Sequence, residues 1–153
     1  MKSVLKFALA GLLMTGMSGH AFANADGVKP EDAIKYRQSV MGVMSWHLKP
    51  LAAMVKGERP FDQDAFVKGA AYLEVLSKMP MEGFIAGSDK GETRAKPEIW
   101  TEMDKFKGGL DKLQADAAKL TQVAKTGDMN QIKAQFGQTA KNCAACHDNF
   151  RKK

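Results

Sequence analysis

The chain has little of the residue types that stabilise small disulfide-rich proteins. It contains only two cysteines in 153 residues, and they lie three positions apart, at Cys143 and Cys146. If that pair serves one purpose, no thiol is left for a disulfide, which excludes a disulfide-stapled fold. Histidine is also scarce, with three residues in all.

Strand-like patterns and charge runs are missing as well. No segment alternates β-branched and polar residues, whereas apolar residues recur at intervals of three and four along the chain, which favours helices. The formal net charge is +6, but no run of five or six like charges occurs. The charge is too weak and too dispersed to indicate nucleic-acid binding.

The first 23 residues have the pattern of a secretory signal peptide. Lys2 and Lys6 precede an apolar run over residues 7–14, and small residues follow up to Ala23. The apolar run is too short to span a bilayer, and a retained amphipathic anchor is the alternative. Cleavage would leave residues 24–153, a single domain of 130 residues with a formal charge of +4.

The two cysteines belong to the run Cys143-Ala144-Ala145-Cys146-His147. The C-x-x-C-H pattern is typical of a c-type haem attachment site, where each thiol forms a thioether and the histidine binds the iron. On a helix, all three side chains would share one face. The pattern therefore predicts one covalently attached haem c per chain. Because such haem is attached outside the bacterial cytoplasm, it agrees with export and predicts a periplasmic protein.

Three other interpretations compete with haem. A thioredoxin-like C-x-x-C needs a βαβ setting, and no strand pattern surrounds this one. A structural zinc site needs four ligands, usually in two pairs, and no second pair exists. The third interpretation is a chance match on an ordinary helix. Haem attachment is the interpretation that the pattern favours.

Helical periodicity predicts a first helix over residues 30–56, opened by Pro30 and followed by Gly57. Pro50 falls inside it, where we expect a kink or a separate final segment. A second helix is expected after the capping residue Asp62, running to about residue 78.

The rest of the chain predicts a loop and two more helices. Residues 79–96 contain one proline and three glycines, and so long a loop in a compact domain is usually functional. The third helix is expected over residues 97–127 and the fourth from Asp128 to the end. One face of the fourth carries Ile132, Phe136, Ala140, Cys143, His147 and Phe150. The predicted fold is all-α: an antiparallel up-down-up-down four-helix bundle with haem on the C-terminal helix.

The core face of the first helix contains a cation. At 100° per residue, that face holds Ile34, Arg37, Met41, Met44, Ser45, Leu48, Ala52 and Val55. A cation on an apolar stripe usually has a specific partner. A haem propionate is the obvious one for Arg37, and Gln38 could donate a second hydrogen bond. The alternative is an arginine that reaches solvent.

The opposite face of the same helix is also apolar, with Tyr36, Val43, Trp46, His47, Pro50 and Met54. It predicts a symmetric homodimer through the first helices, unless these are scattered surface residues. His47 lies about 120° from Met41 around the helix, so it is badly placed to reach the same iron.

The role of Met41 determines whether the haem iron has a sixth protein ligand. It could bind the iron as a sixth ligand, or pack over an open position as an apolar lid. Met44, one turn further on, is a second candidate. Core methionines mostly serve packing, and the residues alone leave both roles open.

The C-terminal run Cys143–Arg151, C-x-x-C-H-D-x-F-R, resembles class II c-type cytochromes, the cytochrome c′ family. The resemblance extends through the blocks 30–38, 55–62 and 94–100. It therefore covers essentially the whole mature chain. Membership implies a four-helix bundle with the haem on the last helix.

The resemblance also implies roles for individual residues. Cys143 and Cys146 correspond to the thioether residues and His147 to the proximal ligand. Four more correspond to residues around the haem: Arg37 and Gln38 on the propionate side, and Arg94 and Lys96 where the loop approaches the haem edge.

The remaining correspondences concern the two axial sides. Arg151 corresponds to a proximal-side arginine that could hydrogen-bond a small ligand. Met41 occupies the variable distal position, where an apolar residue leaves iron five-coordinate and a methionine can be the sixth ligand. Met81 departs from the family, which often has tryptophan there.

Two function classes follow. The favoured one is a haem c protein of cytochrome c′ type that carries single electrons and binds NO or CO at five-coordinate or labile iron. The alternative is a six-coordinate electron carrier with His147 and Met41 on iron. Mild basicity suits an acidic redox partner. We expect no enzyme, since peroxidase chemistry needs a distal acid–base pair and no His–Arg pair shares the Met41 face.

Overall fold

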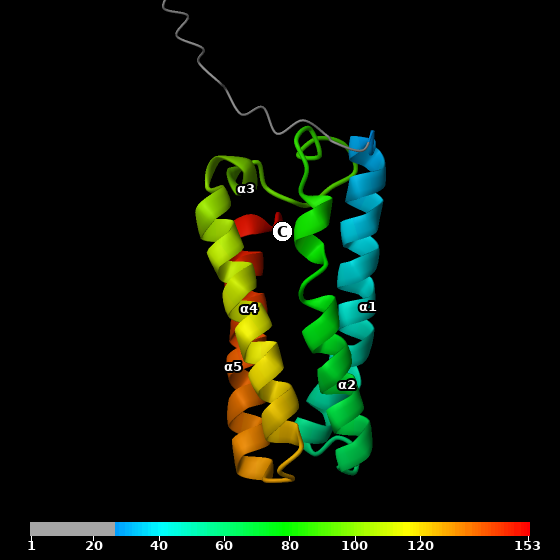
Figure 1. Cartoon of the computed structure of the whole chain (residues 1–153), viewed down its shortest axis with the longest axis vertical. Coiled ribbons are helices and arrows are strands. Elements are labelled where there is room, and N and C mark those ends of the chain that lie inside the picture. Colours follow the sequence, from blue (N-terminus) through cyan, green and yellow to red (C-terminus); the bar gives the residue numbers. More distant parts are fainter. Residues whose placement is uncertain (1–26) are drawn as a thin grey trace, which may run out of the picture.

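The computed structural model describes residues 27–153, so the predicted signal peptide lies outside the described residues. Four long helices form an elongated bundle, in which each helix runs antiparallel to the one before it in the chain (Figure 1). They are α1 (Pro30–Lys56), α2 (Gln63–Leu76), α4 (Met103–Ala124) and α5 (Met129–Phe150). None of the helices in this range is both long and apolar enough to cross a bilayer. The predicted all-α four-helix bundle is confirmed.

The helix ends follow local chemistry. Asp62 accepts a hydrogen bond from the Ala65 backbone N–H at 3.0 Å, and Asp128 accepts from Asn130 and Gln131 at 2.9 and 3.1 Å. Both predicted N-caps are therefore confirmed. α1 ends at Gly57, whose φ of 76° lies in the left-handed region that glycine tolerates.

Pro50 does not divide α1, which continues as one helix to Lys56. The expectation of a separate final segment is wrong. Leu51 and Met54, which follow the proline, are 1% and 4% exposed. The burial of these two side chains holds the last turns in helical register despite the hydrogen bond that proline cannot donate.

The predicted third helix is interrupted. A single turn, α3 (Glu98–Thr101), is separated from α4 by Glu102, whose φ and ψ of −117° and 41° are not helical. In this turn Ile99 is almost fully buried, and the Trp100 indole N–H donates to the Ile85 carbonyl at 3.0 Å. The break allows both side chains to pack on the preceding loop, an interaction that periodicity does not reveal.

The predicted 79–96 loop contains one regular element, the 3-10 turn η1 (Pro80–Gly83). η1 packs against α1. A Cβ on Gly83 would lie 2.7 Å from the Arg37 Cβ and 2.9 Å from the Ala33 carbonyl oxygen. Glycine is therefore required for this close approach.

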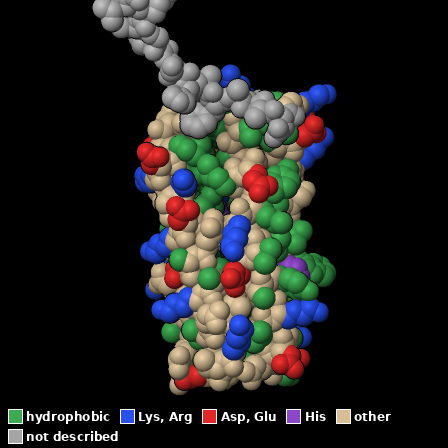
Figure 2. Space-filling model, viewed as in Figure 1, with side chains coloured by type: hydrophobic (Ala, Val, Ile, Leu, Met, Phe, Trp, Pro, Cys, Tyr) green, Lys and Arg blue, Asp and Glu red, His purple; other side chains and the backbone are tan. Residues whose placement is uncertain are grey.

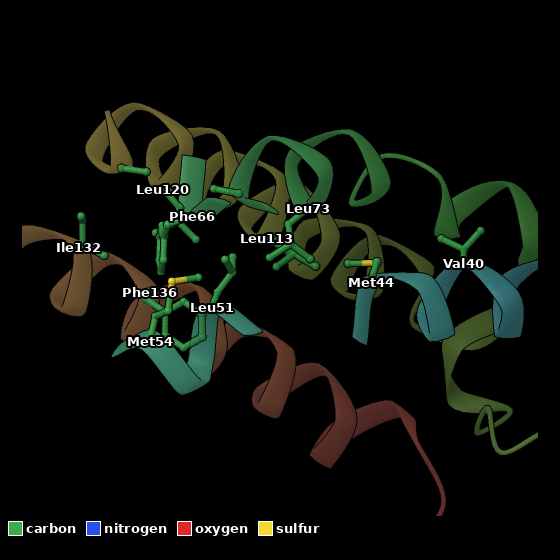
Figure 3. Close-up of a cluster of buried hydrophobic side chains, with 12 residues drawn as sticks. Val40, Met44, Leu51, Met54, Phe66, Leu73, Leu113, Leu120, Ile132 and Phe136 are labelled. Carbon is green, nitrogen blue, oxygen red and sulfur yellow. The ribbon is translucent and has the colours of Figure 1, made fainter. Parts of the chain in front are cut away.

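The larger apolar cluster of the bundle, the lower core, is continuous. Figure 3 shows it gathered from all four long helices. Its fully buried members include Leu51, Phe66, Leu120 and Ile132. Met54 belongs to this core, so its placement on the outward face of α1 is wrong. α2 covers the flank of α1 and widens the buried arc beyond the single stripe expected from the sequence.

A second, smaller cluster lies at the other end, under the 79–96 loop. It consists of Ile99, Phe106, Leu110 and Phe150, with Phe84 and Trp100 packed against it. Phe106 contacts Phe84 and Phe150 at ring-centroid distances of 4.6 and 5.3 Å, both edge to face. Met81 packs on the same cluster. Met81 thus has aromatic neighbours from other positions.

Candidate functional site

A cavity of about 440 Å³ lies between the two apolar clusters. α1, α4 and α5 form its walls, and residues 93–95 border it. α5 packs closely on α4 but meets α1 only sparsely, so these two walls stand apart. Most of the lining is apolar: Met41, Met44, Leu48, Leu73, Phe84, Ile99, Phe106, Leu110, Leu113 and Phe150. Native interiors contain few voids larger than a water molecule, so a cavity of this size is the candidate ligand site.

Cys143, Cys146 and His147 line the cavity together from α5. Both cysteines are free and half-buried, and burial raises the pKa of each thiol. Burial also lowers the pKa of His147, and the neighbouring positive charge of Arg151 lowers it further. The histidine is therefore neutral at neutral pH, the form in which imidazole binds a metal.

Arg37 lines the cavity from α1 and is only 3% exposed, which excludes the solvent-reaching alternative. Its guanidinium is held by the 79–96 loop. One terminal nitrogen donates to the Gly83 carbonyl and the Ser88 hydroxyl, both at 2.7 Å. The other donates to the Ser88 carbonyl at 2.7 Å and the Thr93 hydroxyl at 2.9 Å. With these four bonds made, only Nε–H is left for a further acceptor such as a propionate.

Two aromatic rings complete the surroundings of Arg37. The guanidinium carbon lies 4.6 Å from the Phe84 ring centroid and 5.5 Å from that of Trp100. Stacking of this kind stabilises a buried cation. Burial nevertheless lowers the pKa of Arg37, with a smaller opposing effect from Asp89. The structure thus places a positive charge in the cavity wall with only neutral hydrogen-bond partners.

The other predicted haem-side residues have different positions. Gln38 lines the cavity, and its side-chain amide donates to the Glu92 carbonyl at 2.8 Å. Arg94 and Arg151 also line it, and both are exposed. Lys96 does not line it: its ammonium donates to carbonyls of the last turn of α5, at Asp148 and Asn149, both at 3.0 Å. That position suits a helix C-cap.

Backbone hydrogen bonds join the loop to the C-terminus. Lys96 N–H donates to the Phe150 carbonyl at 2.9 Å, and Lys152 N–H donates to the Arg94 carbonyl at 2.8 Å, an antiparallel pairing around Ala95 and Arg151. The Arg94 guanidinium adds two bonds to the Lys152 carbonyl. The loop therefore links α1, through Arg37, to the end of α5.

Both candidate sulfur ligands face the cavity from α1. Met44 is 9% exposed and Met41 is half-buried. Figure 3 shows Met44 and Val40 at the end of the lower core, apart from Phe66 and Ile132. His47 does not line the cavity, and its ring packs on Tyr72 with centroids 4.6 Å apart.

Sequence reasoning missed two polar residues of the wall, Thr139 and Asn142. They precede Cys143 by four positions and by one, so helical spacing could have placed them near the attachment site. Thr139 is 2% exposed and donates to the Gln135 carbonyl at 2.9 Å. Asn142 donates to the carboxylate of Asp116 on α4.

The cavity fits the predicted cofactor. It is within the usual range of cofactor sites, its walls are mainly apolar, and two free thiols and a neutral imidazole open into it from one helix. Arg37, Gln38 and Arg94 are polar or charged residues of the lining, and haem propionates would be accommodated beside them.

Comparisons with known proteins agree with this geometry. The family model described as cytochrome C′ matches residues 32–151. The cytochrome c′ of Rubrivivax gelatinosus is 44% identical over 126 residues, covering 82% of this chain and 98% of that protein. The cytochrome c′ of Alcaligenes xylosoxydans xylosoxydans is 38% identical over 125 residues, covering 82% and 97%.

Solved structures give the same answer. The cytochrome c prime of Shewanella frigidimarina is 43% identical and superimposes with a TM-score of 0.80, covering 82% of this chain and 98% of that one. A nitric oxide complex of a variant cytochrome c prime from Alcaligenes xylosoxidans superimposes with a TM-score of 0.77 at 38% identity, with the same coverage. With its bundle, its cavity and its C-x-x-C-H run, the chain belongs to the cytochrome c′ family of haem c proteins.

Proposed function

We propose that this chain is a periplasmic one-electron haem c protein that binds NO or CO at five-coordinate or labile iron. Cys143 and Cys146 would hold one haem, and His147 would bind its iron. The observation that carries the proposal is the asymmetry of the cavity lining. It contains a single imidazole, on α5, and the facing α1 wall presents Met41, Met44 and Leu48.

A haem held by Cys143, Cys146 and His147 would supply a one-electron couple and an iron that can bind a diatomic ligand. The apolar side chains of α1 and α4 exclude water from that side. Arg94 and Arg151 place positive charge beside the His147 face. A distal histidine–arginine pair for peroxidase chemistry is missing from the cavity lining, which supports a carrier and binder rather than an enzyme.

The nitric oxide complex among the structural neighbours supports gas binding, since that relative shares the fold at a TM-score of 0.77. The Met41 thioether in the same cavity supports a second candidate, the six-coordinate electron carrier. The two candidates differ only in whether Met41 would be an iron ligand in the protein without bound gas.

Absorption spectra of the oxidised and reduced protein, with and without CO, test the proposal. Rapid CO uptake by the unmodified reduced protein is expected. Slow uptake together with a Met–iron band that disappears in Met41→Ala would favour the carrier instead. Met44→Ala, one turn along the same wall, is the matched control.

We also propose a homodimer through α1. Figure 2 shows hydrophobic side chains gathered along the α1 edge of the bundle. Val43, Trp46, Tyr72 and Val75 are exposed by 45, 74, 42 and 56%. An apolar surface of this kind, carried by two adjacent helices, is typical of an isologous interface. Trp46→Glu should give monomers in sedimentation, and an unchanged mass would place the interface elsewhere.

A further inference from the structure

Asp116 of α4 lies next to the cavity, but it is neither one of the proposed haem-binding residues nor a hydrogen-bond partner of the 79–96 loop. Its side chain and backbone accept hydrogen bonds from three residues of α5, the helix that carries Cys143, Cys146 and His147. Gln135 donates to the Asp116 carbonyl at 3.1 Å and to its Oδ1 at 3.3 Å. The Thr139 hydroxyl shares its single proton between the Gln135 carbonyl at 2.9 Å and the Asp116 carbonyl at 3.3 Å, and Asn142 donates to Oδ2.

These contacts form one polar ladder along the α4–α5 interface. The three donor side chains come from successive turns, because residues 135, 139 and 142 share one face of α5. Gln135 and Thr139 are 7% and 2% exposed, and Thr139 and Asn142 line the cavity. Asp116 is therefore separated from the cavity by a single side chain.

The charge of Asp116 is not neutralised by a neighbour. Lys112 and Lys119 precede and follow it on α4, yet the ion pairs found in residues 27–153 involve other carboxylates, those of Asp32, Glu58 and Glu102. All the hydrogen-bond donors to Asp116 are neutral. A half-buried negative charge without an ion-pair partner acts over a longer range than one screened by a cation.

We infer that Asp116 is a positioning residue that fixes α5 against α4 and whose charge sets the reduction potential of the site. This inference rests on the proposed function, since it needs a redox-active haem on Cys143 and Cys146. A fixed negative charge near the cavity favours the oxidised, more positive form of the centre. Through Asn142, the carboxylate would lower the potential while holding the helix of the attachment residues in register.

Asp116→Asn tests the charge, because asparagine keeps the shape and one acceptor oxygen. In the haem-loaded protein, the equilibrium constant for reduction should rise roughly three- to tenfold, as expected for loss of one unit charge about one side chain from the cavity at intermediate dielectric. Asp111→Asn, on the exposed side of α4, is the matched control with the same change in net charge and should change it much less.

The exchange variant Asp116→Asn/Asn142→Asp separates charge from structure. It keeps an amide–carboxylate hydrogen bond and the net charge, but moves the negative charge onto the cavity wall. Its equilibrium constant for reduction should fall below that of the unmodified protein. A purely structural ladder would leave this constant unchanged or shift both variants in the same direction, and either result would overturn the inference.

The outcomes also distinguish this inference from the proposed function. If the unmodified protein binds haem covalently and cycles between redox states, but Asp116→Asn shifts its potential no more than Asp111→Asn, only the role of Asp116 is wrong. If the unmodified protein has no covalent haem in a denaturing gel stained for haem, both proposals are wrong. If Asp116→Asn does not fold, the exchange variant decides alone.

Discussion

Around Leu120, the helices of the bundle meet in a solid core, whereas around Leu113, two turns earlier on the same α4, they enclose a cavity. The first region is held together mainly by apolar contacts, with Phe66, Leu120 and Ile132 completely buried. The second depends on hydrogen bonds from a buried arginine to a loop. Stability and ligand accommodation are therefore located in different parts of the bundle. One half supplies stability, and the other tolerates a large cavity because polar contacts replace the missing core.

The largest expected effect is on stability, and it compares a leucine of the solid core with a leucine of the cavity wall, both on α4. Leu120→Ala should lower the free energy of unfolding by roughly 2–5 kcal/mol, because it leaves a cavity in a close-packed core. It should leave the haem spectrum unchanged. Leu113→Ala, in the cavity wall, should cost less stability but alter the spectrum. Urea unfolding and absorbance measure both quantities, and equal stability losses would contradict the division.

The second effect concerns the buried arginine. Arg37→Leu should lower the free energy of unfolding by roughly 1–3 kcal/mol, because the carbonyls of Gly83 and Ser88 lose their donor. The loss should be local, so limited proteolysis should cut first within residues 79–96. Gln38→Ala, which loses one exposed hydrogen bond, is the control and should resist the protease like the unmodified chain.

The third effect concerns two glycines, whose replacement by alanine should change stability in opposite directions. Gly83→Ala should destabilise by roughly 1–3 kcal/mol, since its Cβ would press on α1 at 2.7 Å from the Arg37 Cβ. Gly108→Ala should stabilise by up to about 1 kcal/mol, since nothing lies within 4 Å of its Cβ on the exposed face of α4. Thermal melting of both variants measures this, and a stable Gly83→Ala would show that η1 can move freely.

The smallest effect is a pH dependence at the solid end. Hydrogen bonds from Gln131 lower the pKa of Asp128, and the bond from Asn130 has a smaller effect in the same direction. A carboxyl group whose pKa is lower in the folded state stabilises the fold above the ordinary aspartate range, about pH 4, and this contribution disappears as the pH falls below it. The melting temperature of Asp128→Ala should therefore approach that of the unmodified protein in acid. A constant difference between pH 7 and pH 2 would argue against this linkage.

Much of this arrangement could be predicted from the sequence. The recurrence of apolar residues at three and four positions gave the bundle, and Asp62 and Asp128 gave two helix starts. The spacing of Cys143, Cys146 and His147 placed three functional side chains on one face of the last helix, as the structure shows. These are local patterns, within a few residues of one another.

What could not be predicted depends on distant partners. The residues that hold Arg37 lie 46 to 56 positions away in sequence, so helical periodicity could show that the cation was buried but not by what it was bound. The break at Glu102 and the burial of Met54 likewise follow from packing against other elements. Asp116 looked like any charged residue on a helix until α5 was seen beside it.

The pairing of residues 94–96 with residues 150–152 has a consequence for the end of the chain. Residues 150–152 connect α5 to the 79–96 loop, and both of these segments border the cavity. Deleting residues 151–153 would remove Arg151 from the lining and the hydrogen bonds between Lys152 and Arg94, so that Lys96 alone would hold the loop to α5, while the solid core stayed intact. A peptide tag fused after Lys153 would begin two residues beyond that pairing, close to Arg94 and Arg151 of the cavity lining.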